Sequence, residues 1–582
     1  MRNNNLHSRP SDLKFGHFYP IYLAYPSMLN LIPKISKIIR FARAGKRTPP
    51  PIPFELVQHS GIFLEEKLYT QALDLLLNIL TSSTELPTSV FVPSPQHLAI
   101  AATFLVHPST TTCAKTIEEE EAPNASLRLL RLTNTLAGPI SANFRLAFSF
   151  THFESSRQGR RRHEHDSDDD MKPLNLHLGQ SSSVWSRAED FWHAVGWALN
   201  CSVLHRERWQ RWQTWLEFMC EVLEDDWNER IRLHTSTEQG AEKGGDDSKI
   251  LKDSLILRYI TEGTGGYGRN RRILRAIFAD GGSGSVNEFR EVFHKELKQR
   301  KRGGENVKKR EVEVNIDEEQ YGDYLANDDD DEDGSSPGQT DNTTAKAKRP
   351  TRQSKRPRRG TRSKDAHAHA NNDAQTTTHT NGDVALFGGF PSLALRQRLL
   401  HLLSSVSQHL PKCFVSLEEL YHLFAENIRH LPLPTFQALV SPSILPYFSS
   451  AAQTTLCEFL LFRMRESHAA DSDEQYLNQT KLVRCFLPYA ANTSSITDNA
   501  KISITLESLL MLLAESDMLT VTPELQGAVQ TGILARADKA QAESKKSQNS
   551  RKYEDVEWCW LLESGERLMF LVNEILPHAK KT

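Results

Sequence analysis

A long polar segment between about residues 300 and 383 limits how this chain can fold more than any other feature of its sequence. The first half of the segment, EVEVNIDEEQYGDYLANDDDDEDG, contains no lysine or arginine, and the second half, KAKRPTRQSKRPRRGTRSK, contains no acid. Neither half has enough apolar side chains to offset the conformational entropy that ordering would cost. We therefore expect a long disordered charged linker that splits the chain into two helical bodies.

Before this linker, apolar side chains recur at steps of three and four residues, which is the spacing of an amphipathic helix. The first stripe comprises Leu64, Leu68, Ala72, Leu75, Leu76 and Ile79. Pro95 follows at a position that suits the first turn of another helix. We expect a pair of packed helices here. The stretch LYTQALDLLLNIL resembles the second half of a tetratricopeptide unit, and this resemblance also implies a helical pair.

Most of the nine tryptophans lie in the segment VWSRAEDFWHAVGWALNCSVLHRERWQRWQTWLEFMCEVLEDDW. One broad stripe in this segment predicts a long amphipathic helix, and it comprises Trp209, Trp212, Leu216, Met219, Leu223 and Trp227. Ser186 and Glu189 have the spacing of a capping box, so we expect an earlier helix to begin there.

The tryptophans themselves are candidate functional residues. A stripe at helical spacing is typical of a buried face, so we interpret them chiefly as core, with attention to Trp192, Trp209, Trp212 and Trp215. Two alternatives are an anchor for a partner protein and a platform that stacks nucleic-acid bases beside neighbouring arginines.

Helical patterns resume after the linker and continue to the end of the chain. One stripe comprises Leu395, Leu399, Leu402, Leu403, Val406 and Leu410, and the last comprises Leu568, Leu571, Val572 and Ile575. Ser416 and Glu419 form a second capping-box pattern, and Pro523 suits the start of another helix. Short proline-bearing loops separate the stripes, and no convincing strand pattern occurs. The predicted fold class is all-α, either an irregular helical bundle or an α-solenoid-like stack of helical pairs.

These patterns predict how the chain is divided. We expect a mostly disordered or extended segment at 1–51, an N-terminal helical domain at 52–299 with a polar insertion at about 154–182, the linker at 300–383, and a C-terminal helical domain at 384–582. Any domain boundary belongs in the linker, where few contacts would cross it.

The apolar stretch near the N-terminus raises the question of a membrane. Pro20, Pro26 and Pro33 cut it into pieces shorter than the roughly 20 residues that a membrane span needs, so we expect no membrane association. The first 47 residues contain several arginines and Asp12 as their only acid, which leaves a mitochondrial presequence as an alternative.

Gly263, Gly265 and Gly268 match the G-x-G-x-x-G pattern of a nucleotide-binding loop. Such a loop needs a strand before it and an acidic residue about 20 positions later at the end of a second strand. The residues before this loop have helical spacing instead, and no strand pattern carries Glu288. We therefore interpret the loop as a linker between two helices.

No other pattern indicates catalysis. The seven cysteines are scattered without a C-x-x-C pair, and the run HEHDSDDD lies in low-complexity polar sequence that would not hold a metal geometry. Histidine spacing selects no catalytic constellation. We expect no cofactor, no metal site and no small-molecule substrate.

Basic residues provide the strongest indication of function. The run KRPTRQSKRPRRG resembles a nuclear localisation signal, in which an import receptor would bind Lys348, Arg349, Arg352, Lys355, Arg356, Arg358 and Arg359. The same run could neutralise DNA phosphates. The acidic block Asp328–Asp333 could fold back on it or meet basic partners such as histones. A second candidate contact for anions or nucleic acid follows the glycines and comprises Arg269, Arg271, Arg272 and Arg275.

These observations favour a non-enzymatic nuclear scaffold or adaptor that binds partner proteins through helical surfaces, in a chromatin-associated or nucleolar assembly. The alternative is a direct, largely non-specific DNA- or RNA-binding factor that uses the basic linker and the Arg269–Arg275 cluster. A third class is an enzyme whose site is assembled from residues that sequence spacing does not reveal.

Overall fold

The computed structural model describes residues 50, 52–82, 90–150, 174, 176–238, 248–263, 268–297, 387–442, 447–471, 476–544 and 551–579. These residues form helices and no strand, apart from one isolated bridge between Arg465 and Ala491, so the all-α fold class is confirmed. All of them belong to one compact unit of contacts, made of residues 1–300 and 379–582. The segments at 1–49 and 298–386, which contain the predicted extended N-terminus and the linker, lie outside the described residues.

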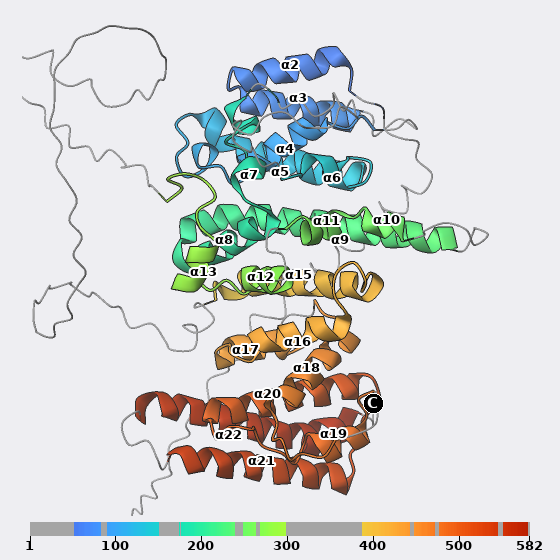
Figure 1. The fold of residues 1–582 in the computed structure, drawn as a ribbon, viewed down its shortest axis with the longest axis vertical. Helices are drawn as coiled ribbons and strands as arrows, with labels where there is room; N and C mark the ends of the chain where they lie inside the picture. Colours follow the sequence, from blue (N-terminus) through green and yellow to red (C-terminus); the bar gives the residue numbers. More distant parts are fainter. Residues whose placement is uncertain are drawn as a thin grey trace, which may run out of the picture. The chain divides into compact units, whose positions relative to one another are not determined.

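The start of the described chain is helical as expected, but the predicted stripe from Leu64 to Ile79 is divided between two helices that pack on each other (Figure 1). The first helices are α2 (Phe54–Glu65), α3 (Tyr69–Ser82), α4 (Pro95–Phe104) and α5 (Ile117–Leu136). Helix α3 packs against α2 and α5, and α4 packs against α5. Pro95 opens α4 as predicted. Thr116 and Glu119 form a capping box at the start of α5, which satisfies two amides that the helix itself leaves unpaired.

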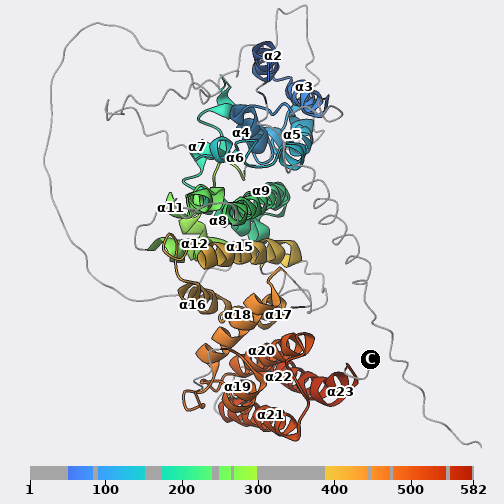
Figure 2. The same ribbon diagram turned by 90° about the vertical axis from the view of Figure 1, so that its right-hand side faces the viewer.

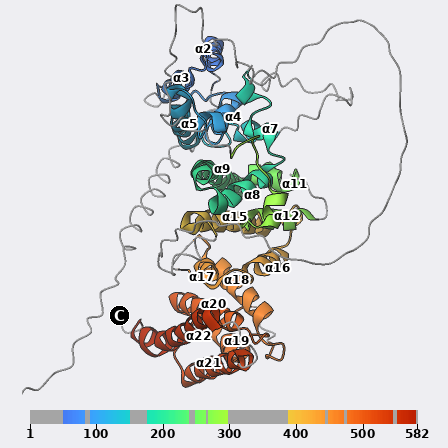
Figure 3. The ribbon, with the colours of Figure 1, turned by 90° about the vertical axis from the view of Figure 1, so that its left-hand side faces the viewer.

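The tryptophan-rich segment forms two long helices that pack on each other. The elements of this part are α6 (Phe144–Ala147), α7 (Val184–Arg187), α8 (Phe191–Leu204), α9 (Arg206–Glu238), α10 (Lys249–Lys252), α11 (Leu255–Thr261), α12 (Arg269–Ile277) and α13 (Ser283–Glu288). Helix α9 contains the whole predicted stripe from Trp209 to Trp227, so the long amphipathic helix is confirmed. Helix α8 packs against α9 and α12 (Figure 3).

The predicted capping box of Ser186 and Glu189 is wrong. Ser186 lies inside the short helix α7, where its hydroxyl donates to the Gln180 carbonyl. Helix α8 begins later, because Asp190 is its N-cap and accepts a hydrogen bond of 2.7 Å from the amide of His193. A carboxylate next to the first helical residue is a strong cap, and here it replaces the serine that the spacing suggested.

The helices after the linker are α15 (Gly389–His409), α16 (Leu417–Ile428), α17 (Leu433–Val440), α18 (Ser450–Met464), α19 (Gln479–Cys485), α20 (Ile496–Glu515), α21 (Pro523–Ser544), α22 (Arg551–Phe570) and α23 (Leu576–Ala579). Ser416 caps α16 by accepting from the Glu419 amide, and Pro523 opens α21, as expected. Helix α20 is largely buried and packs against α17, α18, α21 and α22 (Figure 2).

The last predicted stripe is correct except for Ile575, which is exposed while Leu576 is buried. The cause is a π-helical turn, η7 (Leu571–Ile575), between α22 and α23. A π-turn holds more residues than an α-turn, so the side chains that follow rotate relative to the stripe before them. One extra residue therefore moves the apolar position from Ile575 to Leu576.

Helix α15 packs against α8, α9 and α12. Arg398 forms a two-pronged pair with Glu224 of α9, in which both nitrogen–oxygen distances are 2.8 Å. The buried guanidinium of Arg396 donates to the Ile277 and Ala279 carbonyls, the latter at 2.8 Å. Carbonyls at the end of α12 thus receive donors from a helix more than one hundred positions later in the chain.

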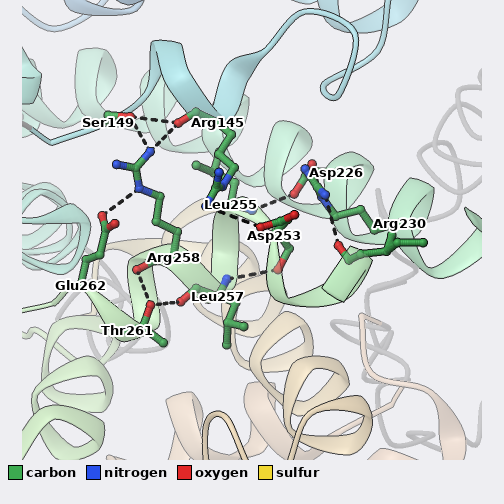
Figure 4. A network of polar contacts seen from close by, with 12 residues as sticks. Arg145, Ser149, Asp226, Arg230, Asp253, Leu255, Leu257, Arg258, Thr261 and Glu262 are labelled. Atoms are coloured by element: carbon green, nitrogen blue, oxygen red, sulfur yellow. Dashed lines mark hydrogen bonds and ion pairs between the residues drawn. The ribbon is translucent and has the colours of Figure 1, made fainter. Parts of the chain in front are cut away.

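A buried carboxylate joins α9 to the segment that starts α11 (Figure 4). Asp226 accepts from Arg230 at 2.9 Å and from the Leu255 amide at 2.8 Å. Burial raises the pKa of Asp226, and the Arg230 charge opposes that shift. Arg258 extends the contacts to α6, because it donates to the Arg145 carbonyl at 2.7 Å and to the Ser149 hydroxyl at 2.6 Å. The network anchors the short helix α11 on two sides.

Stability should fall in acid because His97 is buried in its neutral form. Its ring nitrogens lie 2.9 Å from the Ser60 hydroxyl and 2.6 Å from the Ser94 hydroxyl, and burial lowers its pKa from 6.5 to about 4. Between these two values the unfolded chain binds the proton that the folded chain does not, so the unfolding free energy should drop by on the order of 3 kcal/mol as pH falls from 6.5 to 4. Urea unfolding at several pH values measures this dependence of the unfolding free energy on pH.

His97→Gln should make the unfolding free energy depend less on pH. The control is His59→Gln, at an exposed position, which should leave the dependence unchanged. Equal dependence in all three proteins would contradict the prediction.

Candidate functional site

The predicted arginine cluster lies on α12, where acids and carbonyls of the same chain hold most of it. Arg272 pairs with Asp190 at 2.5 Å, and Arg275 forms a two-pronged pair with Glu288, with both distances 2.7 Å. Arg269 donates to the Thr261 carbonyl at 2.7 Å. These contacts neutralise or occupy three of the four guanidinium groups before any ligand arrives.

Arg271 is the member of the cluster that remains available. Its side chain is 68% exposed, and its nearest carboxylate partner, Glu426 of α16, is 3.8 Å away. A pair at that distance between exposed groups contributes little. Nucleic-acid binding by the cluster stays a prediction, with Arg271 as its most accessible residue.

The glycine pattern is flanked by helices, as expected. Helix α11 ends at Thr261, before Gly263, and α12 begins directly after Gly268, while Gly265 lies outside the described residues. Glu288, at the distance where a nucleotide-binding fold would place its ribose acid, is at the end of α13 and pairs with Arg275.

The four candidate tryptophans lie in the core. Trp192, Trp209, Trp212 and Trp215 are all buried. The Trp192 indole packs against Phe191, and that of Trp212 packs against Trp215 and Phe293. The Trp192 indole donates to the Tyr259 carbonyl at 2.9 Å. A buried indole with an internal hydrogen bond is part of the core, so it is not accessible to a partner.

Glu296, which the sequence did not single out, is the centre of this core. Its carboxylate is buried and accepts from Arg208 at 2.8 Å, from Trp212 at 2.6 Å and from Trp197 at 3.0 Å. Arg208 also donates to the Val106 carbonyl at 2.6 Å. The charges of Arg208 and Glu296 can be buried because each group is paired with the other and makes further hydrogen bonds.

An apolar groove of about 290 Å³ runs among α20, α21 and α22. Ile533 and Ala537 of α21 and Leu562, Gly565 and Met569 of α22 line it. Gly565 permits the close approach of these two helices, because a Cβ atom there would lie 3.2 Å from the Ile533 side chain. The groove is therefore built from a helix pair in tight contact.

Two side chains give the groove polar character. The Ser503 hydroxyl, contributed by α20, is buried in the lining and has no hydrogen-bond partner among the described residues. Glu566 lies at the groove and is exposed. An unsatisfied buried hydroxyl costs free energy unless a ligand or water completes it.

The same helices expose further apolar side chains. Leu562 is 56% exposed although it lines the groove, and Leu534, Val556 and Phe570 on α21 and α22 are also exposed. An exposed apolar side chain that lines an apolar groove, as Leu562 does, is typical of a protein-binding face. We call the surface made by Ile533, Ala537, Leu562, Gly565, Glu566 and Met569 the α21–α22 groove.

The predicted import signal, from Lys348 to Gly360, lies outside the described residues. Among the helices that are described, none is both long and apolar enough to cross a membrane. No protein-family model matches the chain, and no curated protein is significantly similar to it in sequence.

Proposed function

We propose that this protein is a non-enzymatic nuclear scaffold that holds partner proteins on helical surfaces, and that the α21–α22 groove is one of these surfaces. The observation that supports it most is Leu562, a large apolar side chain that lines a groove and is more than half exposed. Burying such a side chain against a partner contributes about 1.5–3 kcal/mol. The unpaired Ser503 hydroxyl at the same groove adds a polar contact that a partner can complete.

The nuclear part of the proposal is supported by the basic run alone. A segment as dense in lysine and arginine as KRPTRQSKRPRRG suits the acidic groove of an import receptor. In a fluorescent fusion, deletion of residues 348–360 should move the protein from the nucleus to the cytoplasm. An unchanged nuclear signal would remove that part of the proposal.

Leu562→Asp should abolish retention of the partner. It places a charge in the centre of an apolar contact, which at an interface hot spot weakens binding by more than about tenfold. The measurement is affinity capture of full-length protein from nuclear extract at high salt, with quantification of proteins retained in stoichiometric amount.

Ile62→Asp is the matched control, because Ile62 is 48% exposed on α2 and lies outside the groove. The scaffold proposal requires that the control retain the partner that Leu562→Asp loses. Equal retention by both variants would reject the groove as the binding surface. A monomer that retains nothing, and instead binds random DNA with steep salt dependence, would favour the nucleic-acid alternative.

A further inference from the structure

A second pocket, of about 370 Å³, lies between α12 and α16. Arg271 and Arg275 line it from α12, and Arg429 and His430 line it from the end of α16. Leu423 gives the lining an apolar part. Glu426 and Asn427 complete the lining, so three guanidinium groups and one carboxylate border the cavity.

Two of these guanidinium groups have capacity for a ligand. Arg275 is already paired with Glu288, but Arg271 approaches Glu426 only to 3.8 Å. Arg429 has no ion pair among the described residues, and its Nε atom donates to the His430 ring at 3.0 Å. Arg271 and Arg429 thus present most of their N–H donors to the pocket and the solvent.

The charge of the lining favours an anion, because three arginines there outnumber the single carboxylate of Glu426. The Lys501 ammonium donates to the Arg429 carbonyl at 2.6 Å and so covers part of the negative end of α16. Burial, and then the charges of Arg429 and Lys501, lower the pKa of His430. The Asp498 charge raises the pKa of His430, but the two neighbouring cations have the larger effect.

We infer that this pocket binds a phosphate monoester carried on a side chain of a partner polypeptide. Phosphate offers three acceptor oxygens and nearly two negative charges, which suits forked donors from two sides better than a carboxylate does. The volume exceeds that of a bare anion, and Leu423 can contact the chain that carries the phosphate. The inference rests on the proposed function in one respect, namely that the ligand belongs to a protein partner.

The test is fluorescence anisotropy of the full-length protein with a labelled pentapeptide, Ala-Ala-phosphoserine-Leu-Ala, and with its serine and glutamate counterparts. The phosphopeptide should bind saturably and at least about tenfold more tightly than either counterpart. Arg271→Gln and Arg429→Gln should each weaken it by about tenfold. Arg484→Gln, an exposed arginine of α19 outside the pocket, should leave affinity unchanged.

Equal affinity for the serine peptide, or full affinity in Arg429→Gln, would overturn the inference. Inorganic phosphate that binds more tightly than the phosphopeptide would also overturn it, because the ligand would then be a free anion. Leu562→Asp separates the two proposals: it should lose the partner of the α21–α22 groove and still bind the phosphopeptide with wild-type affinity. If Leu562→Asp keeps the partner while the phosphopeptide binds as expected, the groove is rejected and this pocket is not.

Discussion

Glu296→Gln is expected to lower the free energy of unfolding by about 3–5 kcal/mol, the cost of removing one partner from a buried ion pair. Arg208 keeps only 4% of its side-chain surface in contact with solvent, so its charge would stay in the core without compensation. The new amide group would also face the Trp197 or Trp212 indole, which are donors themselves. Urea unfolding followed by tryptophan fluorescence measures the loss, since these indoles surround the substituted position.

The matched control is Glu291→Gln, because Glu291 is exposed in the same loop. It should shift the urea midpoint little. The double variant Arg208→Met with Glu296→Leu should recover part of the loss, since apolar side chains remove both charges together. The recovery should be incomplete, because the Trp197 and Trp212 indoles lose their acceptor. If Glu296→Gln and the control shift the urea midpoint equally, the buried ion pair of Arg208 and Glu296 does not stabilise the core.

Gly532→Ala is the second substitution with a large expected effect. A Cβ atom at this position would lie 1.8 Å from the Leu487 carbonyl oxygen, and a backbone atom cannot turn aside as a side chain can. Helix α21 would have to move, and the buried Arg536, which donates to the Leu487 and Tyr489 carbonyls at 3.2 and 3.1 Å, would lose its acceptors. We expect destabilisation of about 3 kcal/mol or more.

Gly527→Ala in the same helix tests the reason for this effect. Nothing lies within 4 Å of the Cβ that it would add, and the position is exposed. Alanine favours the helix by about 0.5–1 kcal/mol over glycine, so this variant should be more stable than the wild type. Thermal unfolding, together with amide exchange of α21, measures the stability change of each variant. Changes of the same sign in the two variants would contradict the close-approach argument.

The elements that follow from local spacing were predictable. The stripe from Trp209 to Trp227 predicted α9, and Ser416 and Pro523 marked helix starts, because caps and apolar periodicity act within a few residues. The Ser186 capping box failed because Asp190, four positions later, makes the stronger cap. Ile575 failed because a π-turn changes the period that the prediction assumes.

The candidate sites depended on contacts that local spacing does not report. Arg208 and Glu296 are 88 positions apart, and nothing near either one indicates the other. The arginines of α12 looked like a free basic cluster because Asp190 and Glu288 become their partners only in the folded chain. The α21–α22 groove likewise depends on the approach of two helices at Gly565, although a glycine within a helical stripe is a signal that could have drawn attention to it.

The position of α15 affects which parts of this sequence can vary during evolution. The pairs that Arg396, Arg398 and Ser405 make with Ile277, Glu224 and Trp227 attach α15 directly to helices encoded before the linker. Covalent continuity through 298–386 is thus not the only connection between the two halves. Outside the proposed import signal at 348–360, changes of length in that stretch can accumulate while the helices on both sides keep their shared interface.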